Sequence, residues 1–153
     1  MALMREIRFR GKVASNNKWV YGSLDTTHTY AFPEWVVIRD PDGEYTVIPV
    51  TVSQFTGACD CCGNRIYEGD ILRHTPQVPK YTLWGWGEGA INLIPECAVV
   101  EWNEFVCAFI GVWLPKGEVE EELPPSYVMS YMTEWEVIGN IYDNPELLEE
   151  TNG

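Results

Sequence analysis

The stretch QFTGACDCCGNRIYEGDIL, residues 54–72, indicates a β-rich fold. The short strand RIY at 65–67 stands between two groups of turn-forming residues, Gly63-Asn64 before it and Glu68-Gly69-Asp70 after it. Glycine accepts the positive φ angles of tight turns, and Asn and Asp side chains bond neighbouring backbone N–H groups. We therefore predict a β corner here, with Glu68 and Asp70 in a structural role. The alternative is a carboxylate pair that serves catalysis or binds a metal.

Sequence on both sides of this corner predicts further strands. The opening REIRFRGKV at 5–13 alternates polar and apolar residues, as a half-buried strand does. This alternation predicts that Ile7 and Phe9 face inward, with Arg8 and Arg10 on the opposite face. Other short strands are expected at 18–24, 29–32, 34–40, 44–51, 71–74, 97–102, 104–114 and 134–142.

About nine or ten short strands at close spacing indicate a mainly β barrel or sandwich. No linker or internal repeat divides the chain, so we predict a single domain over residues 1–153. Asn144-Pro145-Glu146 predicts a short C-terminal helix, because Asn is a preferred N-cap and Pro is favoured at the first helical position. The pattern at 127–132 fits a helix and a strand equally well.

The net charge of −13 is unevenly distributed along the chain. Residues 1–80 hold nine Lys and Arg against nine Asp and Glu, whereas residues 81–153 hold Lys116 alone against fourteen acidic residues. Nucleic-acid binders need clustered cations to displace counterions, so the acidic half is not expected to bind nucleic acid. The first eighteen residues differ, since five cations accompany the single acid Glu6: Arg5, Arg8, Arg10, Lys12 and Lys18.

The chain shows no membrane-spanning run of about 18–20 apolar residues and no apolar stretch typical of a signal peptide. Five cysteines, an odd number, favour reduced thiols over a disulfide framework. A cytoplasmic location, without membrane association, is therefore expected. No motif for a cofactor is present, and none is expected.

Three segments, at 5–24, 51–72 and 134–148, resemble the YopX-like proteins of phages and prophages. They are REIRFRGKV…NNKWVYGSL, TVSQFTGACDCCGNRIYEGDIL and EWEVIGNIYDNPELL. The resemblance implies a phage-encoded protein of unknown molecular function with a small SH3-like barrel or an open barrel of short antiparallel strands. It carries over no catalytic or binding residues. The cysteines at 59, 61 and 62 depart from the Lys-, Asp- and Asn-rich stretch usual in relatives.

Two local features are candidate sites. Cys59 and Cys62 have the spacing of a zinc knuckle, but a zinc site needs four ligands, so thiols in a hairpin loop are the favoured interpretation and no metal is expected. Trp84 and Trp86, each followed by glycine, form a candidate binding surface for protein or peptide. The favoured alternative is that these tryptophans cap one end of the barrel.

These features lead to three functional hypotheses. The first is a non-catalytic protein-interaction module that binds a host or phage protein and forms a homo-oligomer. The second is a nucleic-acid-related role, either direct binding through Arg8 and Arg10 or mimicry of nucleic acid by the acidic half, which includes the run at 118–122. The third is an enzyme, although no nucleophile elbow or phosphate-binding loop is present.

Overall fold

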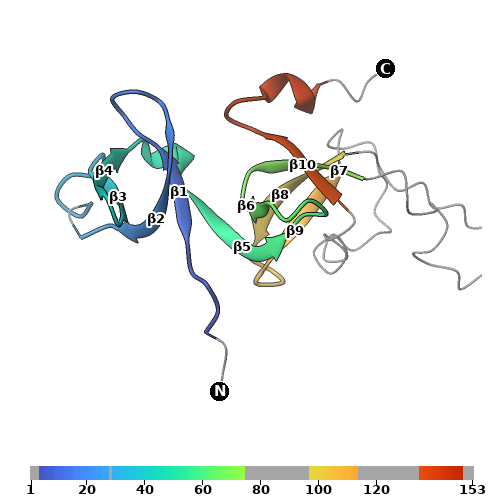
Figure 1. Ribbon diagram of the computed structural model, residues 1–153, viewed down its shortest axis with the longest axis horizontal. Helices are drawn as coiled ribbons and strands as arrows, with labels where there is room; N and C mark the ends of the chain where they lie inside the picture. The colour runs from blue at the N-terminus through green and yellow to red at the C-terminus, as the bar shows by residue number, and fades with distance from the viewer. Residues whose placement is uncertain (1–3, 28, 75–96, 114–134, 150–153) are drawn as a thin grey trace, which may run out of the picture. The chain divides into compact units, whose positions relative to one another are not determined.

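The computed structural model describes residues 4–27, 29–74, 97–113 and 135–149, and these form ten β-strands in two antiparallel sheets (Figure 1). The first sheet consists of β1 (Phe9–Lys12), β2 (Trp19–Asp25), β3 (Val36–Asp40), β4 (Gly43–Val47), β5 (Ser53–Cys59) and β6 (Arg65–Tyr67). The second sheet consists of β7 (Asp70–His74), β8 (Cys97–Asn103), β9 (Ala108–Trp113) and β10 (Trp135–Asn140). Two short 3-10 turns are η1 (Pro49–Thr51) and η3 (Pro145–Leu148). The prediction of a mainly β protein is confirmed.

The chain forms two compact units. The first contains residues 1–58 and 65–68, and the second contains residues 59–64 and 69–153. The chain therefore passes from one unit to the other three times within residues 54–72. A single domain over residues 1–153 stays a prediction.

The first unit is an open barrel. Its strands lie in the order β4-β3-β2-β1-β5-β6, and the chain beyond β1 bends back to β4, where Val13 forms a bridge with Val47. The Ile48 N–H donates to the Lys12 carbonyl at 2.8 Å at the same place. This curled sheet encloses Val36, Ile38 and Val47, and it confirms the open form of the predicted barrel.

The second unit is a four-stranded sheet in the order β10-β7-β8-β9. The strands expected at 97–102 and 104–114 pair as the hairpin of β8 and β9, from Ala98–Trp113 to Asn103–Ala108. Ile71 and Val99 form the centre of a hydrophobic cluster, and Leu147 and Leu148 of η3 pack against it. The described residues contain no helix long and apolar enough to cross a membrane.

The prediction of a short C-terminal helix is wrong. The backbone forms only the 3-10 turn η3, and the Asn144 side chain does not cap it. Instead, Asn144 Oδ1 accepts a hydrogen bond from the Asn140 N–H at 3.3 Å. This contact ties Asn144 back to β10, so its side-chain oxygen is not directed at the first amides of the turn.

One further predicted strand is absent, and the predicted alternation of inward and outward residues at the N-terminus is correct only in part. The strand expected at 29–32 does not form. The chain turns here, the Trp35 N–H donates to the Phe32 carbonyl at 2.9 Å, and the two rings stack with centroids 4.8 Å apart. The predicted alternation around β1 is correct for Phe9, which packs against the cluster of Val36, Ile38 and Val47, but it is wrong for Ile7 and Arg10. Ile7 is 67% exposed, whereas Arg10 and Lys12 are each 6% exposed.

Candidate functional site

A pocket of about 420 Å³ opens on the first unit. Three short segments line it, and each contributes three residues: Glu6, Ile7 and Arg8 before β1, Tyr21, Gly22 and Ser23 of β2, and Arg39, Asp40 and Pro41 at the β3–β4 turn. The predicted binding residue Arg8 is part of this pocket. Arg10 is not part of it.

The pocket exists because β2 extends beyond β1. Pairing between the two strands ends at Phe9 and Gly22, while β2 continues along β3. The Arg8 carbonyl accepts a hydrogen bond from the Phe55 N–H at 2.8 Å, so the chain before β1 stays with β5. Within the described residues, no strand pairs with Ser23 and Leu24 on the side away from β3. The pocket therefore opens beside the edge of a strand.

Gly22 fixes how closely β2 approaches β3 at the floor of the pocket. A Cβ atom at this position would overlap the carbonyl oxygen of Arg39. Because the obstacle is backbone, any larger residue would have to push the two strands apart. The absence of a side chain at Gly22 thus positions the β3–β4 turn against the pocket.

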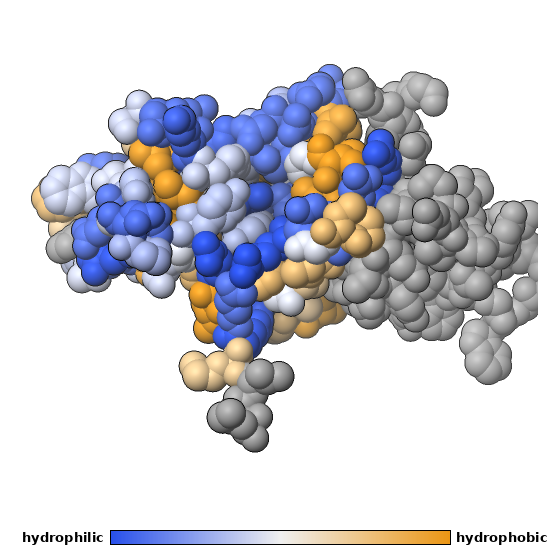
Figure 2. All heavy atoms as spheres, in the orientation of Figure 1, coloured by the Kyte–Doolittle hydropathy of each residue, from blue (hydrophilic) through white to orange (hydrophobic). Residues whose placement is uncertain are grey.

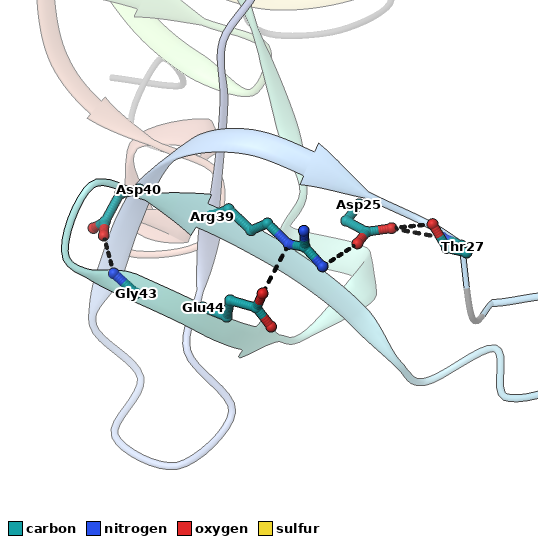
Figure 3. A network of polar contacts seen from close by, with 6 residues as sticks. All are labelled: Asp25, Thr27, Arg39, Asp40, Gly43 and Glu44. Carbon is teal, nitrogen blue, oxygen red and sulfur yellow. Dashed lines mark hydrogen bonds and ion pairs between the residues drawn. The ribbon is translucent and has the colours of Figure 1, made fainter.

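Opposite charges hold the polar side chains on the β3 side of the pocket (Figure 3). The Arg39 guanidinium contacts Asp25 at 2.7 Å and Glu44 at 3.2 Å, one carboxylate from each neighbouring strand. The Asp40 carboxylate accepts hydrogen bonds from the N–H groups of Asp42 at 2.8 Å and Gly43 at 2.9 Å. The network keeps Arg39 and Asp40 in fixed places, and it sets one cation against three carboxylates on this side of the pocket.

On the other wall of the pocket, one carboxylate faces two cations. Glu6 lies 3.8 Å from Arg8 and 3.2 Å from Arg65. A carboxylate thus already faces each cation of the pocket, Arg8 and Arg39. Ile7 and Tyr21 add apolar surface, since their exposed fractions are 67% and 37%. Such a surface suits a ligand with both backbone polar groups and an apolar side chain.

Arg10 is buried in the first unit. Its guanidinium carbon lies 4.6 Å from the ring centre of Trp19 and 4.8 Å from that of Tyr67, and Nη2 donates to the Glu68 carbonyl at 3.3 Å. Lys12 Nζ lies 5.4 Å from the Trp19 ring as well. The sequence pattern placed Arg10 on a solvent face, but the aromatic rings cover that face. Its role as a nucleic-acid ligand is untested, and its burial argues against it.

The cysteine-bearing turn of the second unit is organised by the buried Asp60. Asp60 Oδ1 accepts hydrogen bonds from the N–H groups of Cys62 at 2.9 Å and Asn64 at 2.8 Å. Its Oδ2 accepts a hydrogen bond from the Val137 N–H at 3.0 Å. Burial alone would raise the pKa of Asp60, but these hydrogen bonds and one from the Asn64 side chain outweigh it and lower the pKa. The ionised carboxylate thus joins the turn to β10.

The candidate metal ligands Cys59 and Cys62 are both exposed. Cys59 is the last residue of β5, and Cys62 lies on the turn that follows. Across the described residues, no group of three or more His, Cys, Asp and Glu side chains is placed to hold a metal ion. The thiols closest to each other belong to Cys61 and Cys62, whose Sγ atoms are 3.7 Å apart. The sequence spacing therefore singled out a different pair from the one that the structure brings together.

Of the remaining candidates, the turn at 68–70 lies among the described residues, whereas the tryptophans and the acidic run do not. Gly69 adopts a φ of +81°, as the predicted turn requires, and Asp70 is buried. Trp84 and Trp86 lie outside the described residues, as does the acidic run at 118–122. Their roles stay predictions.

Sequence reasoning missed the pocket residues contributed by β2 and the β3–β4 turn. Tyr21 and Arg39 belong to ordinary strands, and neither stands in a motif. The one available signal is Gly22 inside an otherwise regular strand pattern, because an isolated glycine there often marks a close backbone approach.

Comparison with known proteins supports the fold. The sequence model of the family described as YopX protein matches residues 8–149. The crystal structure of protein EF1440 from Enterococcus faecalis is similar, with a TM-score of 0.51 and 19% sequence identity, covering 95% of this chain and 99% of that chain. At this identity the likeness shows the fold alone. No curated protein matches the chain.

Proposed function

The chain belongs to the YopX protein family, and we propose that it is a phage- or prophage-encoded accessory protein that acts by binding another protein. The proposed place of action is the cytoplasm of the bacterial host, a reducing compartment that suits a chain with five free cysteines. Its proposed ligand is an extended segment of a host or phage protein, and its site is the pocket beside β2. Homo-oligomer formation through other surfaces is compatible with this role.

The pocket beside the strand edge carries the proposal. Extended peptides bind proteins by pairing with an exposed strand edge, while adjacent pockets receive their side chains. Ser23 and Leu24 provide such an edge, and Ile7 and Tyr21 provide apolar surface next to it. The fixed position of Arg39 between two carboxylates means that this wall needs no rearrangement to receive a ligand.

The electrostatics favour a peptide over a nucleic acid. Phosphate binding requires cations that can exchange their counterions for phosphate oxygens. Glu6 already pairs with Arg8, and Asp25 and Glu44 pair with Arg39, so phosphate would compete with carboxylates of the protein itself. Burial of Arg10 and Lys12 removes two further cations from the basic N-terminal segment.

The test compares two exposed apolar residues of the first unit. Full-length protein captures partners from host cells, and the affinity of each purified partner is then measured for wild type, Ile7→Asp and Val50→Asp. Ile7 lines the pocket and Val50 does not, although both are mostly exposed. We expect Ile7→Asp to weaken binding by about tenfold or more, and Val50→Asp to stay within about twofold. Equal binding by both variants would exclude the pocket as the site.

Direct nucleic-acid binding remains the alternative and has its own test. It predicts a salt-sensitive shift of labelled single- or double-stranded DNA or RNA that Arg8→Glu abolishes. Arg10 is left unchanged in this experiment, because a carboxylate between Trp19 and Tyr67 would unfold the unit rather than report on binding. Absence of any shift at low salt rules this role out. The mimicry hypothesis would require that DNA displace the captured partner.

A further inference from the structure

Two adjacent thiols meet on the surface of the second unit. Cys61 and Cys62 are both exposed, and their Sγ atoms lie 3.7 Å apart in sulfur–sulfur contact. Most adjacent side chains along a chain diverge, so this contact reflects the tight turn that Asp60 holds. Cys107 is also exposed in the same unit, but its thiol contacts the Glu104 carbonyl instead of a second sulfur.

The backbone N–H groups of Cys61 and Cys62 take part in the hydrogen bonds that connect the turn to β10. The Cys61 N–H donates to the Trp135 carbonyl at 2.9 Å, and the Cys62 N–H donates to Asp60, which in turn accepts the Val137 N–H. The peptide bond between the cysteines therefore lies inside the connection of the turn to β10. A covalent change at the two sulfurs acts on this connection directly.

We propose that Cys61 and Cys62 form a redox modification site that small-molecule disulfides oxidise to a disulfide between the two adjacent residues. This site lies on the second unit and goes beyond the peptide-binding role proposed for the first. Oxidation closes a ring that contains the Cys61–Cys62 peptide bond. It thereby displaces the Cys61 N–H from the Trp135 carbonyl of β10, and the Cys62 N–H from Asp60, which itself accepts the hydrogen bond from Val137 of β10.

The reaction proceeds by thiol–disulfide exchange. One cysteine loses its proton, and its thiolate attacks a sulfur of the oxidant, forming a mixed disulfide and releasing one thiolate. The second cysteine then loses its proton and attacks the protein sulfur of the mixed disulfide, which expels the remaining half of the oxidant. The two protein thiols are oxidised, and one oxidant disulfide is reduced to two thiols.

The surroundings of the pair also affect the protonation of Cys61. Local desolvation, the contact with Cys62 and the negative charges of Asp60 and Glu136 raise the pKa of Cys61. The thiol therefore keeps its proton at neutral pH, which lowers the fraction of the reactive thiolate at this residue. Once a mixed disulfide has formed, its neighbour lies at a high effective concentration, so closure is fast.

The test treats reduced full-length Cys59→Ser protein with oxidised glutathione and maps the products by mass spectrometry. Removing Cys59 leaves Cys61 and Cys62 as the only thiols between Arg39 and Arg65, so one tryptic peptide reports on the pair. We expect this peptide to lose two hydrogens without a retained glutathione. The matched variants Cys59→Ser/Cys61→Ser and Cys59→Ser/Cys62→Ser should instead retain the mixed disulfide, at a level at least about tenfold higher.

Cys107 serves as an internal control, because this lone exposed thiol should form only a mixed disulfide. Hydrogen exchange gives a second measurement, in which oxidation should accelerate exchange of the Cys61 and Val137 amides. Two glutathione adducts on the 40–65 peptide, no oxidation at all, or unchanged exchange at both amides would overturn the proposal.

Discussion

Arg10 places a positive charge inside the first unit, where two aromatic rings and a carbonyl replace water around it. The guanidinium lies within 4.8 Å of the ring centres of both Trp19 and Tyr67. A desolvated cation above aromatic faces contributes about 2 kcal/mol, and the side-chain stem adds packing. We expect Arg10→Ala to lower the free energy of unfolding by about 2–4 kcal/mol, measured by urea denaturation.

Arg8→Ala is the matched control for this prediction. Its side chain is partly exposed, and its contact with Glu6 is a 3.8 Å surface ion pair, so removal should cost less than about 1 kcal/mol. A similar loss in both variants would mean that the aromatic contacts of Arg10 contribute nothing specific.

Asp60 makes stability depend on pH in a defined direction. Hydrogen bonds lower its pKa in the folded protein below the ordinary value of 3.8, despite its burial. The unfolded chain therefore binds the proton more readily, and the stability that Asp60 contributes is lost as pH falls from about 5 through the folded-state pKa. We expect Asp60→Asn to be less stable than wild type by about 1–3 kcal/mol at pH 7.

The difference between Asp60→Asn and wild type should shrink on acidification, as urea denaturation from about pH 7 to about pH 3 would show. The exposed Asp42 supplies the control variant, Asp42→Asn, for which this convergence is not expected. A constant difference across the whole pH range would contradict the proposed hydrogen-bonded carboxylate.

At the level of elements, β2 and β3 must lie close together for the pocket to form. Gly22→Ala would place a methyl group against the Arg39 carbonyl oxygen, so the two strands must separate. We expect a loss of about 1–3 kcal/mol in unfolding free energy and weaker binding of the captured partner. Gly43→Ala is the control, because its added Cβ would meet only the Tyr45 hydroxyl at 3.9 Å. Comparable losses in the two variants would show that the close approach is unimportant.

Much of this element-level structure follows from local sequence patterns. The Asp40-Pro41-Asp42-Gly43 turn and the β8–β9 hairpin depend on residues within a few positions of one another, which turn chemistry and alternation capture. Burial of Arg10 depends on Tyr67, which is distant in sequence. The pocket likewise combines residues 6–8 with residues 39–41, and no local pattern contains that pairing.

At the level of the whole molecule, the family match spans both units, and so does the similarity to EF1440. The segments of the two units alternate along the chain. Strand β6 joins the first sheet only after the chain has supplied the Asp60 turn to the second unit. Neither unit is therefore a contiguous piece of chain, and no single cut separates them.

This interleaving predicts that the two units unfold together. Because β6 cannot complete the first sheet unless the chain returns from the turn at 59–64, loss of either unit should destabilise the other. Urea denaturation followed by hydrogen exchange of the Val47 and Val99 amides, one buried residue from each unit, should give coincident midpoints. Arg10→Ala, which alters only the first unit directly, should shift both midpoints equally. Separate midpoints, or a shift confined to Val47, would show that residues 1–153 form two domains instead of one.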